Sequence, residues 1–172
     1  MIDIGINHEF QCAEGFQLVV RRAQLEDAMD VLCWRNDPHV RAISRQHETI
    51  DLADHMLWYS KALDDPKRLL FIGLLDGKRI GIVRFDNSLD LKWEVSINIT
   101  CDARGLGIGQ RLLKVALRRL YSVCSSAFVL AEVNLNNEPS LKFFQVMGFK
   151  RVSDDGVFAR FVLAPNTTKT DF

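Results

Sequence analysis

The stretch that decides the fold runs from residue 91 to residue 122 and reads LKWEVSINIT CDARGLGIGQ RLLKVALRRLYS. Its first ten residues alternate between apolar and polar side chains, which is typical of a strand with one buried face. From residue 107 onward, leucines and alanines recur at helical spacing, with arginines and lysines between them. A short loop containing Gly105, Gly107 and Gly109 therefore joins a strand to the start of a helix.

This junction is suited to binding a phosphate group. The first turn of a helix has N–H groups without an internal partner, and the helix dipole adds about half a positive charge there. Glycines let a ligand approach the backbone closely. Two common phosphate loops do not fit: Gln110 stands where the dinucleotide pattern G-x-G-x-x-G needs a glycine, and no Gly-Lys-Ser/Thr follows as in nucleoside-triphosphate loops.

The remaining chain alternates strand-like and helical patterns without a linker or repeat. Strands are expected at residues 16–22, 69–75, 79–86, 91–100, 128–133 and 157–163, and helices at residues 23–37, 51–64, 107–122 and 137–147. Pro38 ends the first helix, and Asp76-Gly77 favours a hairpin. The strand, helix and strand around residues 107–122 predict one parallel crossover in an otherwise antiparallel sheet. We expect a single domain over residues 1–172, loosely ordered at 1–15 and 164–172.

Composition narrows the classes of function. The 172 residues are 48% hydrophobic, and 22 Lys and Arg balance 22 Asp and Glu. This charge balance gives no reason to expect a nucleic-acid or anionic-membrane partner. The apolar runs are far shorter than a bilayer span, so we expect a cytoplasmic protein. The four cysteines, at positions 12, 33, 101 and 124, are scattered and have no histidine at ligand spacing, so neither a disulfide framework nor a metal site is expected.

Two segments carry a resemblance to a known family. The loop RGLGIG (residues 104–109) is followed at the family's spacing by NNEPSLKFFQVMGF (residues 136–149). Together they resemble the acetyl-CoA loop and a later strand–helix signature of the GNAT acetyltransferase superfamily. The resemblance implies an α/β fold with a mixed, mostly antiparallel sheet of six to seven strands and about four helices. It also implies acetyl-CoA as co-substrate and a small-molecule amine as acceptor.

The resemblance assigns cofactor-binding roles to residues in three places. Backbone groups near Ile97 and Ile99 would bind the pantetheine arm, and Asn134 or Asn137 would reach the cofactor from the far side. The pyrophosphate would lie on the loop formed by Arg104, Gly105, Gly107, Ile108, Gly109 and Gln110. Asn137 also reads as a helix N-cap followed by Pro139, and the two roles are compatible.

The chemistry implied by the resemblance needs a base, because an unperturbed alkylammonium is protonated at neutral pH. Glu94, on the polar face of the strand before the glycine loop, is the candidate; the alternative is a solvated carboxylate paired with Lys92 or Arg84. A tyrosine usually protonates the departing thiolate in this family, but Phe144 occupies that position. Water, Tyr121 or Tyr59 are the candidates to replace it.

The acceptor is indicated by the run CWRNDPHVR (residues 33–41), in which Trp34, Arg35 and Asn36 are candidate substrate-binding residues. The run resembles acetyltransferases that modify the 4-amino group of nucleotide-linked sugars in pseudaminic-acid type pathways, and less closely those acting on ribosomal-protein amino termini. A CoA-binding sensor without turnover is the third alternative, and Trp34 could instead pack in the core. Two copies could pair as a homodimer through the edge of the last strand.

Overall fold

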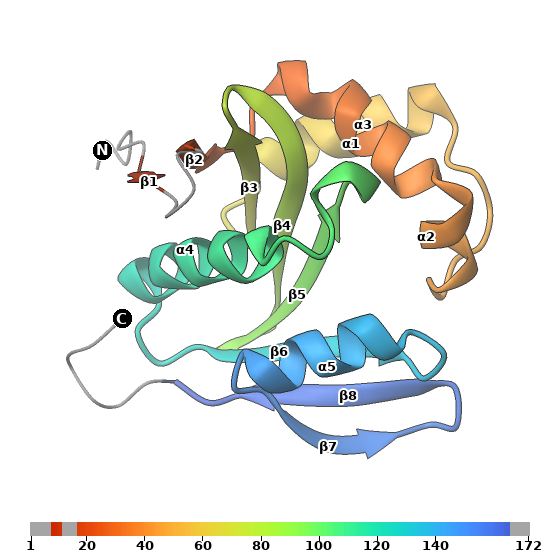
Figure 1. Cartoon of the computed structure of the whole chain (residues 1–172), viewed down its shortest axis with the longest axis vertical. Helices are drawn as coiled ribbons and strands as arrows, with labels where there is room; N and C mark the ends of the chain where they lie inside the picture. Colours follow the sequence, from red (N-terminus) through yellow and green to blue (C-terminus); the bar gives the residue numbers. More distant parts are fainter. Residues whose placement is uncertain (1–7, 12–16, 166–172) are drawn as a thin grey trace.

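The computed structural model describes residues 8–11 and 17–165, which form one eight-stranded sheet flanked by helices (Figure 1). The strands are β1 His8–Gln11, β2 Gln17–Arg22, β3 Arg68–Leu75, β4 Lys78–Leu89, β5 Lys92–Ile99, β6 Phe128–Asn134, β7 Lys150–Asp154 and β8 Phe158–Leu163. The helices are α1 Ala28–Asn36, α2 Pro38–Ala42, α3 Leu52–Asp64, α4 Ile108–Val123 and α5 Glu138–Val146, with 3-10 turns η1 Leu25–Asp27 and η2 Cys101–Ala103. The expected α/β class is confirmed.

The strands follow the order β1-β2-β3-β4-β5-β6-β8-β7 across the sheet. All neighbouring pairs of described strands are antiparallel except β5 and β6, which run parallel. α4 connects these two strands, so the predicted parallel crossover is confirmed. The glycine loop therefore lies directly after the central parallel strand.

Two apolar clusters cover opposite faces of the sheet. Phe71 of β3 and Val83 of β4 belong to the cluster beneath α4 and α5, whereas their neighbours Leu70 and Ile82 belong to the cluster beneath α1 and α3. Successive side chains of a strand point to opposite faces, which accounts for this division. Figure 1 shows α4 crossing one side of the sheet and α1, α2 and α3 gathered together at one end.

The segment after Pro38 forms a second short helix, which the sequence analysis did not expect. A proline pushes the residue before it out of the helical region, yet its own fixed φ suits the first turn of a helix. Asp37 caps this new turn, because its Oδ1 accepts hydrogen bonds from the N–H groups of His39 (2.9 Å) and Val40 (3.1 Å). The same proline thus ends α1 and begins α2.

The two edge strands, β1 and β7, were not among the six strand ranges expected, and the sheet has eight strands instead of six or seven. β1 lies within the stretch predicted to be loosely ordered, whose other residues fall outside the described part, as do residues 166–172. Every residue of β7 is exposed, so no face of this strand needs apolar residues. Its sequence, KRVSD, therefore lacks the apolar alternation that predicts a strand. β8 lies between β6 and β7. The expectation that the last strand offers its edge to a second copy is therefore wrong, because β7 covers that edge.

A buried carboxylate fixes the start of α1 to the sheet. Asp27 is 0% exposed and accepts hydrogen bonds from Arg21 of β2 (2.7 and 2.8 Å), Arg79 of β4 (2.6 Å) and the Gln24 N–H (2.8 Å). Burial by itself would raise the pKa of Asp27, but the hydrogen bonds from Arg21, Gln24 and Arg79 outweigh burial and lower this pKa. Asp27 thereby sets where the N-terminal helices lie on the sheet.

Replacing this carboxylate should destabilise the protein. We expect Asp27→Asn to lower the free energy of unfolding by about 3 kcal/mol, because two arginines lose their shared buried partner. Asp30→Asn is the matched control; the more exposed Asp30 lies 3.5 Å from Arg79, and its loss should cost less than about 1 kcal/mol. Urea denaturation at neutral pH measures both effects.

The contribution of Asp27 to the free energy of unfolding also depends on pH in a defined way. Because its folded pKa is lowered, the stabilisation is complete above the ordinary carboxyl pKa of about 4 and is lost as pH falls through the folded pKa. The difference between wild type and Asp27→Asn should therefore shrink in acid. Equal stability of the two proteins at neutral pH would contradict the assignment.

Candidate functional site

The two central strands separate partway along their length. β5 pairs with β6 at three positions, ending at Glu94 opposite Leu130. Beyond Glu94, β5 stays paired with β4 as far as Ile99, and β6 stays paired with β8 as far as Asn134. The carboxyl-terminal half of β5 therefore has one edge without a neighbouring strand, and Figure 1 shows the space between the two strands widening there.

Backbone groups of Ile97 and Ile99 point toward this open edge. The Thr100 N–H donates to the Ile80 carbonyl in β4 (2.9 Å), and successive residues of a strand direct their backbone groups to alternate edges. Gly81 of β4 is consistent with this direction, since an added Cβ would lie 2.4 Å from the Asn98 carbonyl oxygen. The peptide groups of Ile97 and Ile99 thus face the gap.

The glycine loop places unpartnered amides beside that gap. Gly105 and Gly107 have φ of +76° and +71°, values that favour glycine, and a Cβ at either would find no atom within 4 Å apart from its chain neighbours. Gly107 is the N-cap of α4 and has no side chain to cap it. The first hydrogen bond of this helix runs from the Arg111 N–H to the Gly107 carbonyl (3.4 Å). The N–H groups of residues 108–110 therefore lack an intrahelical partner.

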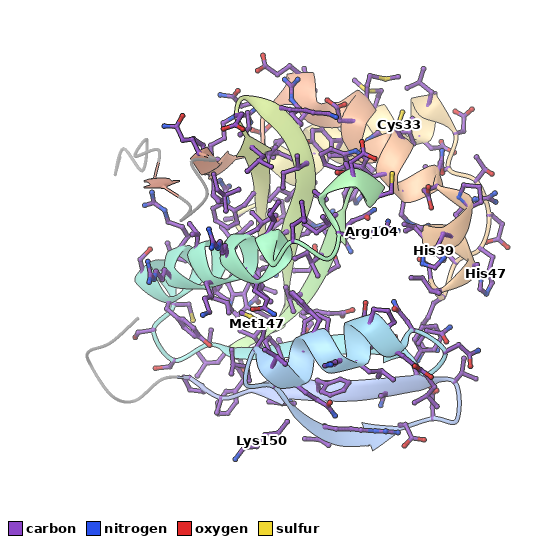
Figure 2. All side chains as sticks on the ribbon, in the orientation of Figure 1. Cys33, His39, His47, Arg104, Met147 and Lys150 are labelled. Atoms are coloured by element: carbon purple, nitrogen blue, oxygen red, sulfur yellow. The ribbon has the colours of Figure 1, made fainter. Side chains whose placement is uncertain are left out.

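At Gly109, α4 lies close to both walls of the gap. A Cβ at this position would lie 3.4 Å from Phe143 of α5 and 3.5 Å from the Ile99 side chain. Arg104, shown in Figure 2 beside the turn between β5 and α4, donates from Nε to the Ile99 carbonyl (2.9 Å). One carbonyl of the open edge is thus satisfied by the loop itself.

On the far wall, both asparagines expected to bind the cofactor also hold the local backbone. Asn137 is the N-cap of α5, with Oδ1 accepting from the Ser140 N–H (3.2 Å). Asn134 is buried at the end of β6, and its Oδ1 accepts from the Asn136 N–H (2.9 Å). In both asparagines the side-chain oxygen makes these contacts, and the amide NH₂ group takes no part in them.

Phe144 stands where the family's tyrosine is expected, and neither tyrosine considered as its replacement lies in a suitable place. Phe144 is buried in an aromatic cluster with Phe149 (centroids 5.0 Å apart) and Phe161 (6.2 Å). Tyr59 is 0% exposed in the cluster beneath α1 and α3. Tyr121 lies in the last turn of α4, roughly 20 Å along the helix from the glycine loop. The sequence-based suggestion that either tyrosine replaces the missing one is therefore not supported.

Glu94 is exposed at the last paired position before the strands separate. It shares a face of β5 with Ser96 and Asn98, and the Asn98 side chain donates to the Trp34 carbonyl at the end of α1 (2.9 Å). The alternative ion pair with Arg84 does not form, because Arg84 pairs with Asp86 (2.7 Å), and no described side chain forms an ion pair with Glu94. Its carboxylate is thus available on the face covered by the N-terminal helices.

The three candidate acceptor residues differ in what they leave free. The Trp34 side chain packs against the cluster beneath α1 and α3, and the Asn36 amide makes two hydrogen bonds of 2.9 Å to the backbone of Ile50. Arg35 donates from Nη2 to the Gln46 carbonyl (2.9 Å), but its buried Nη1 has no partner. Of these three side chains, Arg35 is therefore the one with a buried donor that no described residue accepts.

Arg45, in the loop after α2, fastens the N-terminal helices to the other half of the sheet. Its guanidinium contacts both carboxylate oxygens of Glu132 in β6 (2.9 Å from Nη2 to Oε2), lies 2.6 Å from Asp155, and stacks 4.2 Å from the centroid of Phe158. Hydrogen bonds from Arg45 lower the pKa of both carboxyl groups. The contact spans the two halves that separate after Glu94, and no sequence pattern predicts it, because its residues are distant in the chain.

A pocket of about 270 Å³ lies on the face of the sheet that carries Glu94. Its lining includes Trp58 of α3, Arg68 of β3, and Arg84 and Asp86 of β4. Asp86 lies directly opposite Glu94 in the β4–β5 register, so the pocket adjoins the candidate base. Sequence reasoning did not single out this pocket, because the register brings together residues from three distant segments.

Other reactive side chains do not gather into a second centre. Within residues 8–11 and 17–165, no group of three or more His, Cys, Asp and Glu residues is placed to hold a metal ion. Cys33 and Cys101 are exposed free thiols and Cys124 is half-buried, while Cys12 lies outside the described residues. Figure 2 shows the exposed His39 and His47 on α2 and the loop after it.

Of the described helices, none has the length and apolarity that crossing a membrane requires.

Three known proteins resemble this chain, one in sequence and two in structure. An N-alpha-acetyltransferase of Sulfurisphaera tokodaii is 24% identical over 154 residues, covering 83% of this chain and 86% of that protein. The structure of yncA from Salmonella typhimurium with its cofactor acetyl-CoA matches with a TM-score of 0.73 at 18% identity, over 90% of this chain and 98% of that chain. Spermidine N-acetyltransferase from Vibrio cholerae, in complex with CoA and spermine, gives 0.76 at 15% identity, over 86% and 95%.

The two structural likenesses establish the fold, and a match to a family model establishes the family. Residues 28–149 match the model of the acetyltransferase (GNAT) family, which is well over half of the chain and includes the separated strands, the glycine loop and α5. The chain therefore belongs to the acetyltransferase (GNAT) family and is an acetyl-CoA-dependent N-acetyltransferase.

Proposed function

We propose that this enzyme acetylates the primary amine of a nucleotide-linked amino sugar. The observation that carries acetyl transfer is the open edge of β5 lying beside the unpartnered amides of α4. The observation that favours this acceptor is Arg35, whose buried Nη1 lacks a partner on the face that carries Glu94. Arginine is well suited to phosphate oxygens because its donors form a planar fork.

The residues around the gap fit acetyl-CoA. The amides of residues 105–110 bind the pyrophosphate, and the glycines at 105 and 107 leave space for it. Peptide groups of Ile97 and Ile99 bind the pantetheine arm, with the NH₂ groups of Asn134 and Asn137 on the opposite wall. Arg104 orients the Ile99 carbonyl. Bound in this way, acetyl-CoA supplies the acetyl group as a reactive thioester.

Glu94 acts as the general base that removes a proton from the acceptor ammonium. Two other carboxylates compete on this face. Arg45 and Arg160 bind Glu132, and its lowered pKa makes it a weaker proton acceptor. Asp86, opposite Glu94, forms ion pairs with Arg84 and Arg68. Glu94 has no such partner. A backbone N–H in the segment 97–99 donates to the acetyl oxygen as negative charge develops there. No side chain is needed to protonate the departing sulfur, because a thiol with an ordinary pKa of about 8.5 leaves readily as the thiolate.

A protein or peptide amino terminus is the second candidate acceptor. It is favoured by the relative named N-alpha-acetyltransferase, with which this chain shares 24% identity. A thiol-release assay with acetyl-CoA and two acceptor sets, UDP-linked 4-amino sugars and peptides with free amino termini, separates the candidates. Turnover on peptides alone would replace the sugar proposal. Turnover on neither set would overturn both.

The role of Glu94 predicts a loss of rate without a loss of cofactor binding. We expect Glu94→Gln to lower turnover at neutral pH by about 100- to 10,000-fold and to leave the Kd for acetyl-CoA unchanged. The deficit should narrow at high pH, where more of the acceptor amine is already unprotonated. Glu26→Gln, at an exposed site in the turn η1 before α1, is the matched control. Equal pH–rate profiles for wild type and Glu94→Gln would remove this residue from the mechanism.

The glycine loop predicts a site-specific effect on CoA affinity. Gly107→Ala forces a side chain into the left-handed region and adds a methyl group to the proposed pyrophosphate site, so the Kd for CoA should rise at least 10-fold. Gly156→Ala is matched, because Gly156 also has a positive φ (+85°) and open surroundings but lies in the β7–β8 turn. Each substitution should cost about 1 kcal/mol of folding free energy. Calorimetric titration with CoA tests the difference, and equal affinity in both variants would refute the assignment.

A further inference from the structure

We propose that Arg84, together with Arg35, binds a phosphate or diphosphate group of the acceptor in the pocket beside Trp58. This inference rests on the proposed function and adds the residues and the ligand chemistry that select the acceptor. It concerns a second anion site, separate from the glycine loop, on the face of the sheet that carries Glu94.

The register of the sheet places Arg84 next to the candidate base. Arg84 lies opposite Ser96 in the β4–β5 pairing, and Asp86 lies opposite Glu94. Adjacent strands are about 4.8 Å apart, so an anion held by the Arg84 guanidinium lies on the order of 10 Å from Glu94. One small molecule that carries both an amine and a phosphate can span this distance.

The charges around Arg84 are incompletely balanced. Asp86 is shared, since its carboxylate lies 2.7 Å from the Arg84 Nε and 3.3 Å from the Arg68 Nε. Although it lies within ion-pair distance of Asp86, the buried Arg84 Nε has no hydrogen-bond partner among the described residues. Three cationic side chains, Lys67, Arg68 and Arg84, line the pocket against the carboxylates of Asp65 and Asp86. An anion would neutralise this excess.

Arg35 adds a second guanidinium with an unused donor. Its Nη1 is buried without a partner, which is costly unless a ligand accepts its hydrogen bond. Burial lowers the pKa of Arg35, and the positive charges of Arg84 and Arg41 lower it further. The carboxylate of Glu48 acts in the opposite direction but does not outweigh these effects. Arg41 donates to the carbonyls of Asn36 and His47 and so brings no carboxylate to the cluster. Two like charges held close together favour a ligand that carries negative charge.

Trp58 fits an organic phosphate better than a polycation. Its ring lies 5.5 Å from the Arg84 guanidinium and 5.8 Å from that of Arg68, so cations already occupy its surroundings. A polyamine such as the spermine bound by the Vibrio cholerae enzyme would meet repulsion here. An acceptor with a phosphate for the arginines and a ring for Trp58 meets complementary groups.

The test uses inorganic pyrophosphate as the probe, titrated calorimetrically into the full chain with and without saturating CoA. With CoA occupying the glycine loop, we expect one further pyrophosphate to bind. Arg84→Gln and Arg35→Gln should each weaken this binding about 10- to 100-fold, and Arg84→Lys should restore part of it. Lys150→Gln removes the same charge from exposed β7, far from the N-terminal helices in Figure 2, and should change nothing.

The outcomes separate this inference from the proposed function. Absence of CoA binding in its own titration would refute the proposed function, whereas the dependence on Arg84 is still measured in the CoA-free protein. No pyrophosphate binding at millimolar concentration, or equal binding by wild type and both glutamine variants, would overturn the phosphate site. A thermal denaturation scan of each variant shows that it is folded, so a loss of binding cannot be confused with unfolding.

Discussion

Separation of β5 from β6 after Glu94 is the constraint on which the rest of the structure depends. Polar backbone groups away from water need partners, so an open strand edge inside a sheet is stable only if something else supplies them. Arg104 meets the Ile99 carbonyl. The remaining peptide groups on the open edge of β5 and the first amides of α4 lie outside the regular pairing of strands and helix. In the proposed function, acetyl-CoA supplies their partners.

Contacts on both faces of the sheet hold the two halves in this separated arrangement. On one face α4 and α5 meet where Gly109 approaches Phe143. On the other face Arg45 connects the loop after α2 to Glu132 and Asp155. Arg45 and Asp155 are partly exposed to solvent, so salt weakens this contact. Apolar packing therefore holds the two halves on one face, and a network of ion pairs holds them on the other.

Much of the fold and the cofactor side of the site could be predicted from the sequence, because both depend on local patterns. Alternation gave β5, the glycines gave the start of α4, and the order of elements gave the parallel crossover. Exposed β7 has no such pattern, and α2 depends on Asp37 capping a turn that Pro38 permits. The pocket at Trp58 and Arg84 depends on long-range register, which short sequence spacings do not contain. Packing of Trp34 against the core was one of the two expected outcomes, whereas the hydrogen bonds of Asn36 to Ile50 were not expected.

The difference in predictability follows from the chemistry of the two ligands. The proposed cofactor side consists mainly of main-chain N–H and C=O groups, which every residue except proline offers in full. Sequence is constrained there only where backbone conformation requires glycine, and those few glycines form a recognisable pattern. The proposed acceptor side consists of side chains such as Glu94, Arg84 and Trp58, which follow no local spacing. A family with one cofactor and many acceptors is therefore recognised by its loop, and its individual substrates must be inferred from charge and shape on the opposite face.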